Sequence, residues 1–270
     1  MRLLNLAAVL LLIAVAGGAG FVWSGLYDIS ATDQHLPPTY QLIELMMRRS
    51  VERRGANIPV PELGGEARLV RGLALYRRHC VQCHGAPGVA PEPFALGMTP
   101  LPAPLVQTGR EWSPGELFWV IKHGIKMTGM PAWKFRLGDE EIWALVAFMR
   151  GQLPYVTPAQ YRALPDVKAE QSPPALREPD PARGREALQQ YACVACHRIP
   201  GVTGPEARVG PPLEGIGSRQ MLAGVLPNSP DNMVRWIRFP HELSPLGAMP
   251  GLGVSERDAR DIAAYLATLK

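Results

Sequence analysis

The sequence predicts a mostly α-helical protein, in which one N-terminal transmembrane helix is followed by two helical domains built on the same plan. Three observations support this fold class. An apolar run lies near the N-terminus, the stretches 65–155 and 181–270 repeat the same order of motifs, and helix-start signals recur at matching places in both stretches. A length of 270 residues is typical of about two domains.

The N-terminal run contains no charged side chain from residue 3 to residue 27. About 20 apolar residues cross the hydrocarbon core of a bilayer, so residues 1–27 are expected to form a transmembrane anchor. Arg2 predicts that the N-terminal end stays in the cytoplasm, and Trp23 suits the opposite interface. The alternative is a signal sequence, with the Ala-Val-Ala at 14–16 as a cleavage site. Both interpretations place the rest of the chain in the periplasm, outside the inner membrane.

Residues 28–64 are predicted to be a juxtamembrane segment with one amphipathic helix, from about Tyr40 to Arg54. Basic side chains crowd the C-terminal half of this helix, where cations suit the helix dipole. Its apolar face allows packing on the adjacent domain, a position among lipid headgroups, or docking on a membrane partner. This face consists of Leu42, Ile43, Met46 and Met47.

The two similar stretches, 65–155 and 181–270, are each expected to fold as one domain. Each begins with a helix that leads into a Cys-x-x-Cys-His motif and continues through a Gly- and Pro-rich loop to a middle helix. Each then ends with Met-Pro and a closing amphipathic helix. Between them, residues 156–180 are rich in proline and are expected to form an extended linker. The expected N-cap residues are Ser113 and Ser229 for the middle helices and Asp139 and Ser255 for the closing helices.

The charge of the chain excludes one class of partner. The net charge of +4 is spread along the sequence without a block of like charge. Nucleic-acid binding is therefore not expected. A mild preference for acidic protein partners is compatible with this balance.

All four cysteines lie in the two Cys-x-x-Cys-His motifs, a spacing typical of covalent haem attachment. Two thiols one helical turn apart can add to the vinyl groups of one porphyrin, and the adjacent histidine can bind the iron. A zinc site would need four ligands brought together, and a thioredoxin-like pair would need a βαβ setting. The duplication, the histidines and the predicted export favour two haems c. The motifs are Cys80, Cys83 and His84, and Cys193, Cys196 and His197.

A methionine followed by proline lies after each motif, before the closing helix. Met130 and Met249 are therefore predicted to be the sixth ligands of the two irons. Haems with closed His/Met ligation have raised reduction potentials and transfer electrons without binding a substrate. Met127 is the main rival of Met130. Met98, Met127, Met221 and Met233 are expected to fill gaps in the core.

Further expectations concern the surroundings of the two irons. A carbonyl near Pro102 or Pro104, and one within Pro211-Pro212-Leu213, is expected to accept a hydrogen bond from the ligand histidine. Other side chains are expected to meet haem propionates or pack on the ring: Arg219, Trp133 and Trp236. A basic group is expected either to rim the first haem and steer an acidic partner, or to form an ordinary solvated face: Lys122, Lys126, Lys134 and Arg136.

The sequence resembles the class I cytochrome c family in its membrane-anchored di-haem form. The resemblance rests on LYRRHCVQCHG with IKMTGMPAW, and on CVACHRIPG with VGPPLEGIG, and it covers 65–155 and 181–270. It implies two tandem class I cytochrome c domains, each with its first and last helices crossing at the haem edge. It also implies two covalently bound haems c, held by Cys80, Cys83, Cys193 and Cys196, with axial ligands His84, Met130, His197 and Met249. The second domain looks like those that accompany haem–copper oxidases, and the first is more divergent.

The expected function is electron relay on the periplasmic side of the membrane. The expected donor is a dehydrogenase or a cytochrome bc complex, and the acceptor is a terminal oxidase. Such a protein is an electron carrier and not itself an enzyme. A second hypothesis makes it a fixed subunit of a dehydrogenase or oxidase complex. A third, a di-haem peroxidase, requires an iron with an open position, which two Met-Pro motifs disfavour.

Overall fold

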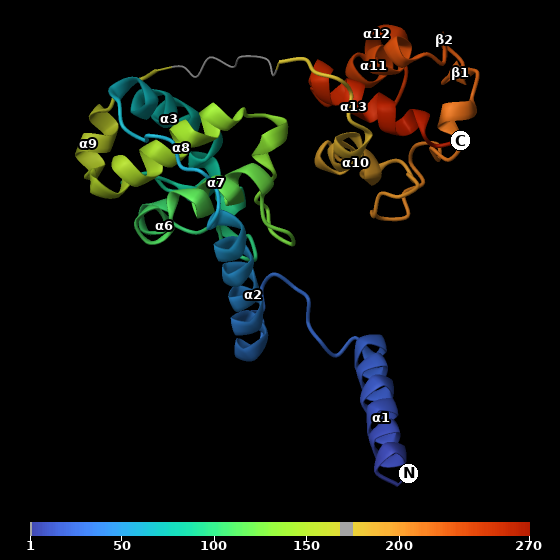
Figure 1. Cartoon of the computed structure of the whole chain (residues 1–270), viewed down its shortest axis with the longest axis horizontal. Coiled ribbons are helices and arrows are strands. Elements are labelled where there is room, and N and C mark those ends of the chain that lie inside the picture. The colour runs from blue at the N-terminus through green and yellow to red at the C-terminus, as the bar shows by residue number, and fades with distance from the viewer. Residues whose placement is uncertain (1, 168–174) are drawn as a thin grey trace.

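The computed structural model describes residues 2–167 and 175–270, and these residues are mostly helical. Figure 1 shows two helical bodies side by side; α2 extends from the body that contains α3 to α9, and a loop joins α2 to α1. We call the body formed by α3 to α9 the first domain and the body formed by α10 to α13 the second domain. The predicted fold class is confirmed. Part of the predicted linker, residues 168–174, lies outside the described residues.

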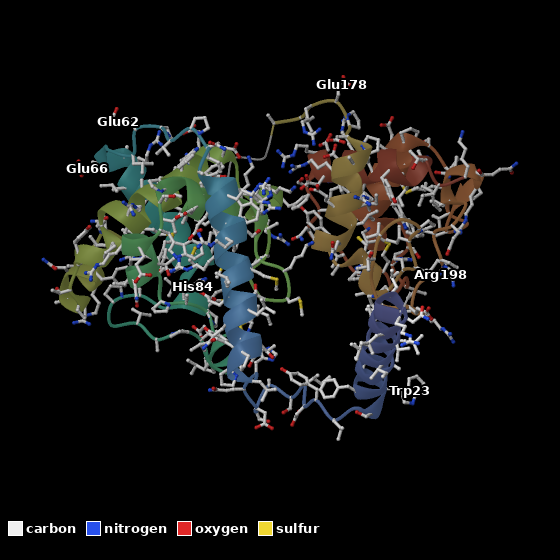
Figure 2. The ribbon with its side chains drawn as sticks, turned by 60° about the horizontal axis from the view of Figure 1, so that its bottom comes forward. Trp23, Glu62, Glu66, His84, Glu178 and Arg198 are labelled. Carbon is white, nitrogen blue, oxygen red and sulfur yellow. The ribbon has the colours of Figure 1, made fainter. Side chains whose placement is uncertain are left out.

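Helix α1, Arg2–Ser24, is predominantly apolar and carries no charged side chain after Arg2. Between Leu4 and Ser24 it is long and apolar enough to cross a membrane, and none of it is buried against the rest of the protein. Trp23 stands at its C-terminal end with its side chain free (Figure 2). The length and composition of this helix are those of either a membrane anchor or a signal sequence.

Helix α2, Pro37–Gly55, begins three residues before the predicted start at Tyr40. Two prolines occupy its first turn, where a missing N–H costs no hydrogen bond. The last turn packs on α7, Pro114–His123, and Gly55 lies so close to the backbone of Glu116 that a side chain there would collide with it. The predicted apolar face remains exposed, apart from Met47, which is half-buried.

The first domain is organised around two crossing helices, α3 (Glu66–His79) and α8 (Asp139–Gly151). They approach closely because Gly72 of α3 lies directly against the carbonyl oxygen of Ala144 in α8. Tyr76 and Phe148 fill the space beside this crossing, with ring centroids 5.3 Å apart. The remaining elements are α4 (Val81–His84), α5 (Pro93–Leu96), α6 (Leu105–Glu111), α7, η1 (Trp133–Phe135), η2 (Leu153–Tyr155) and α9 (Pro158–Ala163).

The second domain repeats this crossing with α10 (Pro181–Gln190) and α13 (Glu256–Ala267). Here Gly184 lies against the backbone of Asp261. The crossing of first and last helices that the family resemblance implied is thus present in both domains. The other elements are η3 (Cys193–Ala195), η4 (Ile216–Ser218), the antiparallel pair β1 (Met221–Leu222) and β2 (Leu226–Pro227), α11 (Pro230–Arg238) and α12 (Pro240–Leu243).

Three of the four predicted helix caps are confirmed. The hydroxyls of Ser113, Ser229 and Ser255 each accept a hydrogen bond from a backbone N–H in the first turn. The prediction for Asp139 is wrong, since this residue is the first of α8 and Gly138 precedes it. The carboxylate of Glu141 accepts a hydrogen bond from the N–H of Gly138 instead.

The segment expected to be an extended linker begins with helix α9. Tyr161 on this helix is buried in the core of the first domain. Arg77 of α3 lies over the ring of Tyr161 and donates hydrogen bonds to the carbonyl oxygens of Tyr161, Leu164 and Pro165. The prediction of an extended linker, made from the proline-rich composition, therefore missed the short helix α9, which belongs to the first domain.

Candidate functional site

Each Cys-x-x-Cys-His motif forms a single helical turn. The amide of His84 donates to the carbonyl oxygen of Cys80 at 2.9 Å, and the amide of His197 donates to that of Cys193 at the same distance. The amide of the second cysteine also donates to this oxygen, at 3.1 Å in the first motif and 3.2 Å in the second. The two motifs therefore present their thiols and imidazoles in matching arrangements.

The first thiol of each motif is poorly suited to thiolate chemistry. Burial raises the pKa of Cys80 to about 12 and that of Cys193 to about 11. A reactive redox thiol has a lowered pKa instead. Within the described residues, no group of three or more His, Cys, Asp or Glu side chains could hold a metal ion, so the two motifs do not meet in a zinc site.

Each histidine is oriented by a backbone carbonyl. Nδ1 of His84 lies 2.7 Å from the oxygen of Ala103, and Nδ1 of His197 lies 2.8 Å from that of Pro211. A carbonyl can only accept, so Nδ1 donates and the lone pair remains on Nε2. Within the described part of the chain, Nε2 of neither ring makes a hydrogen bond. This is the arrangement of a metal-ligating histidine with an outer hydrogen-bond partner.

These carbonyls agree closely with the sequence prediction. In the second domain the acceptor, Pro211, is one of the three residues predicted, and in the first domain it is Ala103, between the two candidate prolines 102 and 104. Burial also lowers the pKa of His84 and favours the neutral imidazole that can bind a metal. A feature that the sequence did not reveal is Gly210, where a Cβ would lie 2.5–3.0 Å from ring atoms of His197.

The loop that carries the acceptor of His197 is supported by Arg219. Its guanidinium donates to the carbonyl oxygens of Pro212 at 2.7 Å and Glu214 at 3.0 Å. Trp133 is buried in the core of the first domain, and Trp236 packs against the core of the second. Contacts of these three side chains with a haem stay predictions.

Met130 lies at the end of a closed loop. Its carbonyl oxygen accepts the N–H of Ile125 at 3.3 Å, and its own N–H donates to the hydroxyl of Thr128 at 3.0 Å. Both Met130 and Cys80 are half-buried against the core of the first domain. The rival Met127 is 95% exposed, on a backbone with φ of 59°.

Two other methionines, Met249 and Met98, are half-buried in loops of the second and first domains. Met249 is half-buried in the loop before α13, and the described residues give no contact that brings it to His197. Met98, expected to fill the core, is also half-buried, and its Sδ lies 3.5 Å from the position of a Cβ on Gly129. Its thioether is therefore close to the Met130 loop, which spacing alone did not indicate.

The residues present fit a haem in both domains. Each motif offers two thiols and an imidazole whose Nε2 makes no hydrogen bond to the residues that the structure describes, and a thioether follows in the chain. The loop that supplies each carbonyl acceptor also exposes an apolar side chain two residues earlier, Leu101 at 64% and Val209 at 78%. Exposed apolar side chains beside a donor set are available to contact an apolar macrocycle.

Most of the basic side chains near Met130 contact other groups of the protein. Lys122 pairs with Asp139 at 2.8 Å. Lys134 pairs with Glu186 of the second domain, and Arg136 donates to the carbonyl oxygen of Gln190. Lys134 and Arg136 thus both contact the second domain; the side chain of Lys134 is only 17% exposed, whereas Arg136 remains exposed. Steering of an acidic partner by this group stays a prediction. Lys126 is exposed and makes no ion pair within the described residues.

Comparison with known proteins identifies two families in tandem. Residues 67–149 match the family described as cytochrome c oxidase, cbb3-type, subunit III, and residues 181–270 match the cytochrome c family. Two curated relatives are similar over about a third of this chain. Both are named cytochrome c oxidase subunit 2, from Alkalihalophilus pseudofirmus (37% identical over 89 residues, 33% of this chain and 25% of the relative) and from Bacillus sp. strain PS3 (29% over 101 residues, 36% and 28%). The chain thus spans about a quarter of their length, and no solved structure matches.

Proposed function

Two cytochrome c domains in tandem make this chain a di-haem class I cytochrome c, and from this premise we propose that it relays electrons on the periplasmic side of the inner membrane. In this proposal each domain binds one haem c. Covalent attachment uses Cys80, Cys83, Cys193 and Cys196. The axial iron ligands are His84, Met130, His197 and Met249.

The observation that carries the proposal is the pair of hydrogen bonds from Nδ1 to a carbonyl, at 2.7 Å in the first domain and 2.8 Å in the second. They fix the tautomer that leaves Nε2 able to bind iron, and they do so in both domains. When bound, a haem supplies reversible one-electron chemistry. The protein supplies the imidazole, the thioether and an apolar setting, all of which influence the reduction potential.

The ligand set favours a carrier over an enzyme. If Met130 and Met249 complete the ligand sets of His84 and His197, neither iron would offer a position to a substrate. The half-buried place of Met130 beside the same core as Cys80 supports this arrangement in the first domain. A di-haem peroxidase would need one iron without a sixth protein ligand.

We propose a respiratory dehydrogenase or a cytochrome bc complex as the donor and a terminal oxidase as the acceptor. The family matched by the first domain is named for a cbb3-type oxidase subunit, and both relatives are named as oxidase subunits. In this proposal α1 anchors the protein, residues 28–64 form the juxtamembrane segment, and the remainder of 156–180 beyond α9 links the domains.

A fixed subunit of an oxidase or dehydrogenase complex is the alternative function. The exposed apolar side chains on the first half of α2 favour it, because they are available to a membrane partner. Purification in mild detergent followed by mass spectrometry distinguishes the two. Stoichiometric copurifying subunits support a complex, whereas the isolated chain supports a free relay.

The deciding experiment is a redox titration of the purified protein together with a pyridine haemochrome assay. We expect two covalent haems per chain, low-spin spectra in both oxidation states, and two one-electron waves. A high-spin signal from one haem in the oxidised protein would support the peroxidase instead. Absence of covalent haem after maturation in a competent host would refute the proposal.

A further inference from the structure

One segment of the first domain is buried in the second. Residues 132–136 follow directly after Met130 and its proline, yet Ala132 and Phe135 belong to the core of the second domain. Trp133, between them, packs in the core of the first domain. Phe135 is only 2% exposed. The chain therefore places neighbouring side chains in two different cores.

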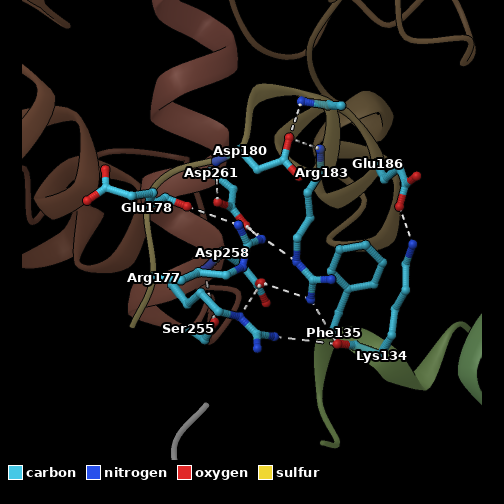
Figure 3. A network of polar contacts seen from close by, with 12 residues as sticks. Lys134, Phe135, Arg177, Glu178, Asp180, Arg183, Glu186, Ser255, Asp258 and Asp261 are labelled. Atoms are coloured by element: carbon cyan, nitrogen blue, oxygen red, sulfur yellow. Dashed lines mark hydrogen bonds and ion pairs between the residues drawn. The ribbon is translucent and has the colours of Figure 1, made fainter. Parts of the chain in front are cut away.

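Phe135 lies in a site formed by α10 and the residues that follow it, chiefly Arg183 and Tyr191. We call this site the seat of Phe135. The guanidinium of Arg183 lies over the ring of Phe135 at 4.9 Å, and the ring of Tyr191 meets it edge-on at 6.4 Å. Figure 3 shows Phe135 and Lys134 entering this site beside Arg183. A cation over an aromatic face and an edge-to-face ring pair are both favourable in a desolvated setting.

The backbone of the segment is also paired with the second domain. Arg183 donates to the carbonyl oxygen of Lys134 at 2.9 Å. The hydroxyl of Tyr191, which donates to the carboxylate of Asp258 at 2.9 Å, also lies 3.3 Å from the carbonyl oxygen of Phe135. The N–H of Ala132 donates to the side-chain oxygen of Gln190 at 3.3 Å. Because buried backbone groups need partners, moving the segment out of its seat would leave several of them unpaired.

Two buried carboxylates hold Arg183 in place. Asp258 and Asp261 of α13 are 0% and 1% exposed, and their oxygens lie 3.5 Å and 3.4 Å from the guanidinium. Arg177 lies 2.8 Å from Asp261 (Figure 3), and Arg257 lies 3.4 Å from Asp258. Buried carboxylates require such compensation. The same arginine thus serves the charge network of the second domain and the seat of Phe135.

We propose that Phe135 is a positioning residue for Met130. This rests on the proposed function, in which Met130 is the sixth ligand of the first iron. The loop is fixed on its N-terminal side by the bond between Ile125 and Met130, and on its C-terminal side by the seat in the second domain. A loop that is already ordered loses little conformational entropy when its thioether binds. The second domain therefore helps to hold the ligand of the first.

The test is the variant Phe135→Ala in the holoprotein. Its readouts are the charge-transfer band of methionine bound to ferric haem and the midpoint potential of each haem. We expect partial loss of the band from the first haem and a downward shift of its potential, because His/Met ligation raises the potential. The second haem should keep its potential. Adding Met249→Ala to both proteins removes the second methionine ligand, so the remaining band reports on Met130 alone.

Two further variants distinguish positioning from general damage. Phe135→Leu keeps an apolar side chain in the seat and should restore most of the band. Leu222→Ala removes buried volume from the second core at β1, on the side of the second domain away from the first (Figure 1), and should leave the first haem unchanged.

A full band and an unchanged potential in Phe135→Ala would overturn the inference. An equal disturbance of the first haem in Leu222→Ala would also overturn it, because the effect would then be one of overall stability. If the wild-type protein itself lacks two covalent haems or lacks the methionine band, the proposed function fails first, and the haem assay shows which of the two has failed.

Discussion

Gly210 lies where the backbone of its loop runs against the imidazole of His197. A Cβ at this position would meet ring atoms at 2.5–3.0 Å, closer than ordinary packing allows. The N–H of Gly210 also donates to the carbonyl oxygen of Cys196 at 2.8 Å, so the loop has little freedom to withdraw. The imidazole is therefore held both by its hydrogen bond to Pro211 and by contact with this residue.

We expect Gly210→Ala to displace the ring of His197 and to destabilise the second domain by about 1–3 kcal/mol, as overpacking does. The low-spin signal of the second haem should decrease while that of the first is retained. Optical spectra and haem quantification of the purified variant measure this. Gly97→Ala is the matched control, because a Cβ at Gly97 meets nothing within 4 Å. Equal spectra for both variants would contradict the proposed contact.

Titration of Tyr191 should make the stability of the folded protein depend on pH, and this dependence can be assigned to one side chain. Burial, followed by the carboxylate of Asp258, raises its pKa from 10.0 to about 12. The unfolded chain therefore loses this proton first as the pH rises. The protonated phenol of Tyr191 therefore contributes fully to folding stability below about pH 10, and this contribution declines as the pH increases towards about 12.

We expect the urea midpoint of the wild-type protein to fall more steeply over this range than that of Tyr191→Phe. The variant lacks the titrating phenol, whereas the other buried tyrosines are common to both proteins and cancel. Urea unfolding at a series of pH values measures the two slopes. Parallel curves would show that Tyr191 does not titrate as proposed.

The roles of several individual residues could be predicted correctly from the sequence close to them. The three serine caps and the carbonyl that orients His197 follow from hydrogen bonds within a few residues or one loop, so their spacing in the sequence carries the information. Gly210 and Phe135 could not be found in this way. Their roles depend on which distant group the backbone approaches, and the periodicity of one segment says nothing about that.

At the scale of elements, the crossing of α10 and α13 depends on the absence of a side chain at Gly184. This residue lies against the backbone of Asp261, and the corresponding contact in the first domain joins Gly72 to Ala144. The closing helices of both domains were predictable as amphipathic helices from the sequence, and their crossing with the first helices was an implication of the family resemblance. The close approach at these glycines was not predictable, because a glycine in a helix looks unfavourable when only propensity is considered.

The variant Gly184→Ala distinguishes the effect of helix propensity from the effect of close packing between α10 and α13. Helix propensity alone predicts a gain in stability of about 1 kcal/mol. The contact with Asp261 predicts the opposite, a loss of about 1–3 kcal/mol from overpacking. We expect the loss, measured as a lower midpoint for the second domain in urea unfolding. A gain would show that the helices can separate to accommodate a methyl group.

At the scale of the whole molecule, α1 contributes nothing to the packing of the domains, because no part of its apolar window is buried. Replacing residues 1–27 by a cleavable signal peptide should therefore yield a soluble protein with both haem spectra and both midpoint potentials unchanged. Membrane fractionation of the full chain and of the replacement measures this. N-terminal sequencing of the full chain then shows whether α1 is retained, and a mature protein that begins after residue 16 would contradict the anchor.

The plan of two domains after one apolar helix was predictable because each motif occurs twice in the same order. The contact between the domains was not. Lys134 and Arg136 looked like a solvent-facing basic group around Met130, but both make contacts with the second domain. Charge patterns along one segment cannot show that a partner surface lies within the same chain.

The burial of Phe135 also limits what can be learned by dividing the protein at its proline-rich middle. A fragment made only of the second half would open an empty aromatic seat to water and remove a backbone partner from Arg183. A fragment made only of the first half would expose the same ring to solvent. Measurements on either half would therefore describe a surface that the intact polypeptide does not possess.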